Sequence, residues 1–227
     1  MEKEFDILTG AKRLDEVRFS KIRTVMDMVA DLRAKGEKVL ALSAGEPDFD
    51  TPAPIKEAVI KALEENYTHY GSNRGYPALR KLLSEKLEKE TGVSYDPETE
   101  IIFTTGGAEA LNNAFMAVVD PGDEVIVFAP FFGEYRQYAA NFDADIVTVN
   151  PDLRTFQPDL ADFVAKITEK TKALIVNTPN NPTGVIYKPE TMQAIAAILE
   201  KKQEEYGHDI YLISDEPYRE LVYDGNK

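Results

Sequence analysis

The chain has 227 residues, of which 43% are hydrophobic and 29% charged, and none is cysteine. The formal net charge of −14 excludes a surface for nucleic acid or anionic membranes, because either would need clustered Lys and Arg. The lack of cysteine excludes a disulfide framework and a thiolate metal site, which is typical of a reducing compartment. The first residues lack the features of a signal peptide, and no apolar run reaches transmembrane length. We therefore expect a globular cytoplasmic enzyme or binding protein without a metal site.

The first half of the sequence predicts an extended N-terminal arm, then helices separated by long loops. Apolar residues at helical spacing predict a helix over residues 22–35, and a short strand is expected over residues 39–42. The loop that follows this strand is dense in Gly, Pro and acids, and is costly to keep ordered unless something uses it. Helical patterns over residues 54–66 and 78–90 flank an aromatic, glycine-rich loop at residues 67–77.

From residue 100 onward, apolar strand patterns alternate with helical patterns. The expected strands are residues 101–105, 124–129, 146–149, 173–177 and 210–214. The expected helices between them are residues 108–119, 133–141, 159–167 and 189–206. This alternation is typical of an α/β fold with a mainly parallel sheet that helices cover on both faces.

The carboxyl ends of these strands carry the residues with chemical interest, and ligands of open α/β sheets bind at that edge. The first strand enters Gly106 and Gly107, which open a helix whose free N–H groups and dipole would bind an anion. The third glycine and the acidic residue of a dinucleotide fingerprint are missing, so the pattern favours one phosphate over a pyrophosphate. Taken alone, a Gly-Gly turn is more often structural.

Three further strand ends add an aromatic, an amide and an acidic group. Residues 130–135 place aromatic rings where a flat ligand ring would stack, and residues 177–184 bring amides that do not titrate. Asp215 follows the last strand, and Tyr218 comes shortly after it. Each feature also has a structural explanation: the aromatics as core residues, the amides as turn residues, and Asp215 and Glu216 as residues that cap a turn or pair with Arg219. Together they predict a pocket for a flat, phosphorylated, cationic ring.

Five motifs occur in this order: SAGEPDF, YGSNRGYPALR, TTGGAEAL, NTPNNPTG and SDEPY. With them, essentially the whole chain resembles the aminotransferases of fold type I that depend on pyridoxal 5′-phosphate, in the class I/II group of aspartate and aromatic aminotransferases. The resemblance implies transfer of an amino group between an amino acid and a 2-oxo acid, by a homodimer with shared active sites. It also implies an arm and the start of a small domain over residues 1–50, and a cofactor-binding large domain over residues 51–227.

The resemblance assigns contacts with the cofactor to Gly107, Ala108, Phe132, Asn181, Asp215, Tyr218 and Tyr70. It makes Asp215, Tyr218 and Asn181 the catalytic residues. It also places Gly45 in the loop that closes over the substrate.

These roles agree with what the side chains can do. By the resemblance, Asp215 pairs with the protonated ring nitrogen, a charge-assisted hydrogen bond worth roughly 1.5 to 3 kcal/mol. That proton keeps the ring an electron sink. Asn181 and Tyr218 donate to the phenolic oxygen without adding a competing charge. Phe132 stacks on the ring, and Tyr70 reaches the phosphate of the neighbouring subunit.

The family's Schiff-base lysine and its C-terminal small domain would lie beyond Lys227. We therefore expect the chain to be a fragment or a truncated product, and the isolated 227-residue polypeptide to be inactive. Two alternatives stay open. One is a lyase, decarboxylase or synthase with the same fold and cofactor, and the other is a regulator domain that binds the cofactor without turnover.

Overall fold

The computed structural model describes residues 21–42, 45 and 47–225. These residues form two units that divide after Gly106 in the sequence, one from Lys21 to Gly106 and one from Gly107 onward. The extended arm expected before the first helix lies outside the described residues, and the domain boundary expected at residue 50 stays a prediction.

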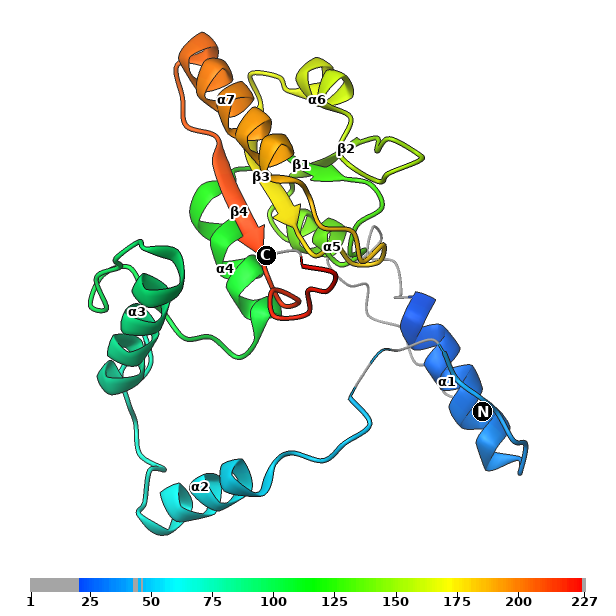
Figure 1. The fold of residues 1–227 in the computed structure, drawn as a ribbon, viewed down its shortest axis with the longest axis vertical. Coiled ribbons are helices and arrows are strands. Elements are labelled where there is room, and N and C mark those ends of the chain that lie inside the picture. The colour runs from blue at the N-terminus through cyan, green and yellow to red at the C-terminus, as the bar shows by residue number, and fades with distance from the viewer. Residues whose placement is uncertain (1–20, 43–44, 46, 226–227) are drawn as a thin grey trace, which may run out of the picture. The chain divides into compact units, whose positions relative to one another are not determined.

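The unit from Gly107 onward is built on a four-stranded parallel sheet (Figure 1). Its strands are β1 (Glu124–Phe128), β2 (Asp145–Val149), β3 (Thr171–Asn177) and β4 (Tyr211–Asp215). They lie in the order β2-β1-β3-β4, and each neighbouring pair is parallel. The expectation of an α/β fold with a mainly parallel sheet is thereby confirmed.

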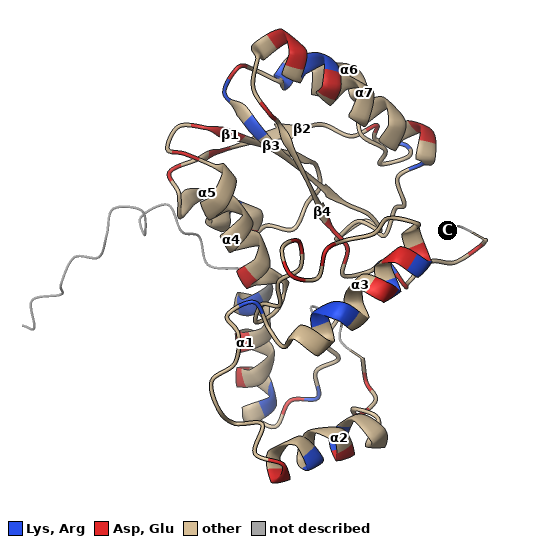
Figure 2. Ribbon diagram, turned by 90° about the vertical axis from the view of Figure 1, so that its left-hand side faces the viewer, with Lys and Arg blue, Asp and Glu red and all other residues tan. Residues whose placement is uncertain are grey.

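Four helices of this unit cover the sheet on both faces: α4 (Gly107–Val118), α5 (Tyr135–Ala140), α6 (Leu160–Lys166) and α7 (Pro189–Tyr206). Successive side chains of a strand point to opposite faces, so β1 feeds two cores. Val125 and Val127 pack with α4 and α5, whereas Ile126 and Phe128 pack with α6 and α7. Charged residues lie mainly on helices and connections, as Figure 2 shows, so the strands are apolar on both faces, as a covered parallel sheet requires.

Local sequence sets the ends of the α6 and α7 helices. The Asp159 side chain caps α6 by accepting hydrogen bonds from the backbone N–H groups of Ala161 and Asp162. Pro189 occupies the first turn of α7, where its missing N–H costs nothing. Gly207 ends α7 with a φ of 72°, a left-handed conformation that glycine adopts without a steric penalty.

The path of the chain determines where a ligand can bind. It runs from β1 through α5 out to β2, returns through α6 to β3 on the other side of β1, and continues through α7 to β4. The direction of travel therefore reverses between β1 and β3. In open α/β sheets, ligands bind at the carboxyl ends of the strands beside such a reversal.

The unit from Lys21 to Gly106 contains helices α1 (Lys21–Ala34), α2 (Ala53–Glu64) and α3 (Pro77–Thr91). The strands predicted over residues 39–42 and 101–105 are wrong, because neither segment belongs to a sheet within the described ranges. A short apolar run becomes a strand only if a neighbour takes up its backbone hydrogen bonds. Here the N–H of Phe103 instead donates to the carbonyl of Arg74 over 3.1 Å.

That contact holds the aromatic, glycine-rich loop against residue 103. Gly75 has a φ of 91°, and a Cβ added to it would lie 2.9 Å from the Cβ of Phe103. Only glycine fits here without a shift of the backbone. Nearby, the buried Arg80 of α3 donates to Glu98 over 3.0 Å.

Within the described part of the chain, no helix has the length and apolar character needed to cross a membrane.

Candidate functional site

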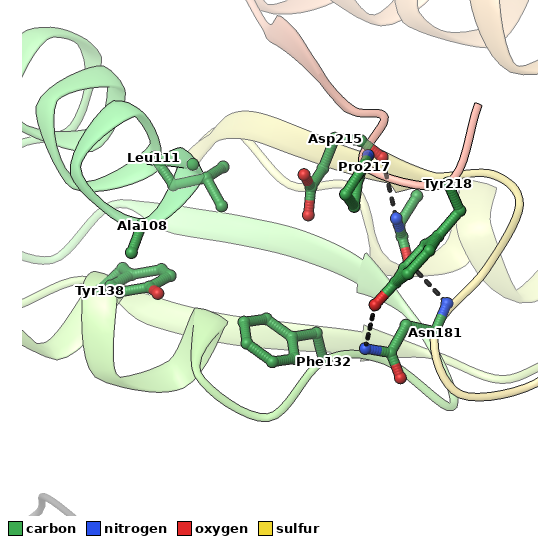
Figure 3. Close-up of a pocket in the computed structure, with 10 residues that line it drawn as sticks. Ala108, Leu111, Phe132, Tyr138, Asn181, Asp215, Pro217 and Tyr218 are labelled. Carbon is green, nitrogen blue, oxygen red and sulfur yellow. Dashed lines mark hydrogen bonds between the residues drawn. The ribbon is translucent and has the colours of Figure 1, made fainter. Parts of the chain in front are cut away.

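A pocket of about 240 Å³ lies at the carboxyl ends of β3 and β4, within the unit that begins at Gly107 (Figure 3). Its lining residues come from the start of α4, the segment after β1, the α5 helix, and the ends of β3 and β4. They are Gly107, Ala108, Leu111, Phe132, Tyr138, Asn177, Asn181, Asp215, Pro217 and Tyr218.

One side of the pocket is the N-terminus of α4. The first backbone N–H groups of a helix have no partner inside the helix, and the dipole adds a partial positive charge there. Gly107 begins this helix of 12 residues, and apart from its chain neighbours and the backbone of the same helix, no atom lies within 4 Å of the position where its Cβ would be. Gly106, just before it, has a φ of 82°. A glycine-led helix start with open space beside it fits a phosphate-sized anion.

Aromatic rings form a second side. Phe132 lies below the pocket in Figure 3, and its ring meets the ring of Tyr135 edge-on, with centroids 5.6 Å apart. Tyr138 lines the pocket beside Ala108. Burial raises the pKa of the Tyr138 phenol, and the charges of Glu134 and Asp215 raise it further. Phe132 therefore offers a flat apolar surface, and Tyr138 a neutral hydroxyl.

Amide and phenol groups form the third side. Asn177 is buried at the end of β3, where its side-chain amide donates to the Asp215 carbonyl over 2.8 Å. Its amide oxygen accepts from the backbone N–H of Asn181 over 2.7 Å. Asn181 in turn donates its side-chain N–H to the hydroxyl of Tyr218 over 3.1 Å (Figure 3). Asn177 thus holds the loop after β3 and the end of β4 in one arrangement.

The carboxylate of Asp215 faces this pocket from the last residue of β4. The parallel register places Asp215 beside Asn177, so the two strand ends are level. The Tyr135 hydroxyl donates to Oδ2 of Asp215 over 2.5 Å. None of the ten residues that line the pocket in the described part of the chain is Lys or Arg. The half-buried negative charge therefore favours a ligand that brings its own positive charge.

The structure brings six of the predicted site residues together in one pocket: Gly107, Ala108, Phe132, Asn181, Asp215 and Tyr218. Their individual roles stay predictions. Tyr70 and Gly45 belong to the unit from Lys21 to Gly106 and do not line this pocket. The side chain of Tyr70 is fully exposed. The roles predicted for both residues stay predictions. Arg219 lies 3.9 Å from Glu216, which makes it an ion-pair partner of that residue.

Sequence reasoning included Asn177 and Tyr135 in the segments 177–184 and 130–135 but gave neither an individual role, and it missed Tyr138. Asn177 is the last residue of a predicted strand, which is the position that delivers side chains to the ligand edge. The two tyrosines have a weaker signal. They lie one helical turn apart on α5, and such a pair is more often part of the core.

Comparison with known proteins shows the family of the chain. Residues 37–227 match the family described as aminotransferase class I and II. The chain is 42% identical over 218 residues to a probable aspartate/prephenate aminotransferase of Thermus aquaticus, covering 95% of this chain and 55% of that protein. It is 36% identical over 214 residues to an aspartate aminotransferase of Thermotoga maritima, again covering 55% of the relative.

Solved structures give the same result. The aspartate aminotransferase of Thermus thermophilus with maleate matches with a TM-score of 0.88 and 40% identity, covering 97% of this chain and 56% of that one. The alanine aminotransferase of Pyrococcus furiosus matches with a TM-score of 0.87 and 36% identity, covering 96% and 55%. The chain spans about half the length of the curated relatives it matches.

Proposed function

Because the chain belongs to the class I and II aminotransferase family, we propose that the whole protein transfers an amino group between an amino acid and a 2-oxo acid, with pyridoxal 5′-phosphate as its cofactor. The observation that carries this proposal is the polarity of the pocket. The N-terminus of α4 suits an anion, and the Asp215 carboxylate suits a cation. The names of the relatives make aspartate the first amino acid to test.

The residues of the pocket fit such a cofactor by their chemistry. When bound, pyridoxal phosphate supplies an electron sink for the bond that breaks beside the amino group. Asp215 holds a proton on the ring nitrogen, because a nearby carboxylate favours the charged form of its partner. The N–H groups at Gly107 and Ala108 bind the phosphate.

The remaining residues orient the ring. Phe132 provides the flat surface against which the ring packs. The amide of Asn181 and the hydroxyl of Tyr218 lie 3.1 Å apart, and both donate to the phenolic oxygen of the cofactor. Neither side chain carries a positive charge. Both can therefore stabilise the negative charge on that oxygen without competing with the ring nitrogen for the Asp215 carboxylate.

A charge placed at the helix start tests the phosphate site. Ala108→Asp keeps the helix, because an acidic residue in the first turn is favourable. The new carboxylate should nevertheless weaken pyridoxal phosphate binding by at least about 100-fold, since like charges 4 Å apart repel by roughly 4 kcal/mol at an effective dielectric constant of 20. The affinity is measured by titrating the whole protein, purified without cofactor, and following the absorbance of the ligand.

Two controls accompany this titration. Ala117→Asp adds the same charge to an exposed position of α4, about 13 Å further along the helix, and should leave the affinity nearly unchanged. Pyridoxal, which lacks the phosphate, should bind the wild type and the Ala108→Asp variant equally. An equal loss for pyridoxal would show that the variant damages the pocket in general. Failure of the wild type to bind pyridoxal phosphate would contradict the proposed function.

We further propose that the enzyme is a homodimer in which Tyr70 serves the site of the partner subunit. The support is the fully exposed Tyr70 side chain, presented by a loop whose conformation Gly75 and Phe103 hold. Mixing Tyr70→Ala protein with Asp215→Asn protein should then restore turnover, because each heterodimer would contain one site with both residues intact. Tagged heterodimers isolated by size would be assayed. Heterodimers no more active than the two parents would exclude shared sites.

We also place the enzyme in the cytoplasm. The support is compositional: the sequence has no cysteine and a strongly acidic balance. Both features are compatible with a reducing compartment and a small-molecule substrate.

A further inference from the structure

A hydrogen bond joins two residues of the site that are 80 positions apart in the sequence. The hydroxyl of Tyr135 donates to Oδ2 of Asp215 over 2.5 Å. Tyr135 is 1% exposed, so water does not compete for this contact. A short O–H···O⁻ bond to a carboxylate is of the strong, charge-assisted kind.

The surroundings of Tyr135 leave its ring little freedom. The ring is stacked on Phe131 at a centroid distance of 6.3 Å and meets Phe132 edge-on at 5.6 Å. It belongs to the core cluster that includes Phe115 of α4 and Ala139 of α5. Close-packed interiors hold side chains in single rotamers. The hydroxyl is therefore presented to Asp215 by a rigid support.

The hydroxyl of Tyr135 acts as a donor over the whole working range of pH. Burial is the main cause that raises the pKa of Tyr135 well above its ordinary value, and the hydrogen bond and the charge of Asp215 raise it further. A phenol that keeps its proton cannot take one from the cofactor ring. Its bond to Oδ2 fixes the rotation of the Asp215 carboxylate.

We propose that Tyr135 is a positioning residue for Asp215: it holds Oδ2, so that the carboxylate keeps one orientation toward the ring nitrogen of the cofactor. This inference rests on the proposed function. Tyr135 does not touch the reacting atoms. It acts through Asp215, as outer-shell hydrogen-bond partners act through the groups that bind a ligand directly.

The test compares two probes that differ only in the ring nitrogen: pyridoxal phosphate and 1-deazapyridoxal phosphate, in which carbon replaces that nitrogen. In the whole protein, Tyr135→Phe should weaken pyridoxal phosphate binding by about tenfold, the lower end of the loss seen when outer-shell partners of metal ligands are removed. Binding of the deaza compound should change by less than about twofold, since it makes no bond to Asp215 that Tyr135 would strengthen. The ¹⁵N chemical shift of labelled pyridoxal phosphate bound to the variant should move toward the unprotonated value.

Tyr187→Phe is the matched control. This tyrosine is also buried, on the other face of the sheet, where its ring meets Phe128 edge-on and burial raises the pKa of Tyr187 to about 12. Loss of its hydroxyl should change the affinity for neither probe.

In the Asp215→Asn background, Tyr135→Phe should also leave the ratio of the two affinities unchanged. That double variant isolates the coupling of the two residues from any loss of packing.

An equal loss of affinity for both probes would show a merely structural role for Tyr135 and overturn the inference. Unchanged affinities, or an unchanged ¹⁵N shift, would overturn it as well. If the wild type binds neither probe, the proposed function fails, and that failure is visible before any variant is made. If Tyr135→Phe does not fold, as judged by circular dichroism, replacement of Tyr135 by 3-fluorotyrosine should still alter the ¹⁵N shift, and no change would again count against the proposal.

Discussion

Asp215→Asn in the whole protein should lower turnover by about 10³-fold or more. Asparagine has the size of aspartate, and the backbone carbonyl at this position can still accept the hydrogen bond from Asn177, so we expect the fold to persist. The negative charge is lost, and with it the group that holds a proton on the ring nitrogen. Removing one preorganised electrostatic contact at a transition state typically costs 10²–10³ in rate, and the loss of the electron sink adds to this.

The measurement is the rate at saturation with the amino acid and the 2-oxo acid that the wild type uses best. The matched control is Asp145→Asn, because Asp145 is exposed at the first residue of β2, at the opposite edge of the sheet. That variant removes the same charge and should keep the wild-type rate. If the Asp215→Asn variant binds the cofactor and its rate is within tenfold of the wild-type rate, Asp215 has no catalytic role in the reaction.

Phe163→Ala should lower the free energy of unfolding by about 3–5 kcal/mol, the usual cost of truncating a buried phenylalanine. Phe163 is 0% exposed and lies in the core between the sheet and the α6 and α7 helices. Its ring meets the ring of Phe128 edge-on with a centroid distance of 5.4 Å. Close packing leaves no side chain free to fill the space that the ring vacates.

The neighbouring Val164 supplies the comparison, because it is 42% exposed on the same helix. Val164→Ala should change the free energy of unfolding by no more than about 0.5 kcal/mol, as is usual for surface positions. Both values follow from the midpoint of urea unfolding at an unchanged slope. Equal shifts for the two variants would mean that the α6 face of the sheet is not a packed core.

The α/β class and the positions of the helices could be predicted from the sequence because their signals are local. A period of 3.6 for a helix, and an apolar run between turn residues for a strand, are written in the side chains of each segment. Residues 189–206, for example, begin at a proline and end before a glycine, and α7 spans those same residues. The motifs likewise identify six residues of the pocket. Phe132, Asn181, Asp215 and Tyr218 stand at or shortly after the ends of β1, β3 and β4, whereas Gly107 and Ala108 open the α4 helix.

Only the tertiary structure decided which segments pair and which distant side chains meet. Residues 101–105 are as apolar as a strand, but a strand exists only if another one accepts its hydrogen bonds. The contact of Tyr135 with Asp215 depends on the order β2-β1-β3-β4, and the level ends of β3 and β4 depend on the register of the ladder. Neither order nor register is encoded in any one segment, because both arise from the packing of several segments into a common core.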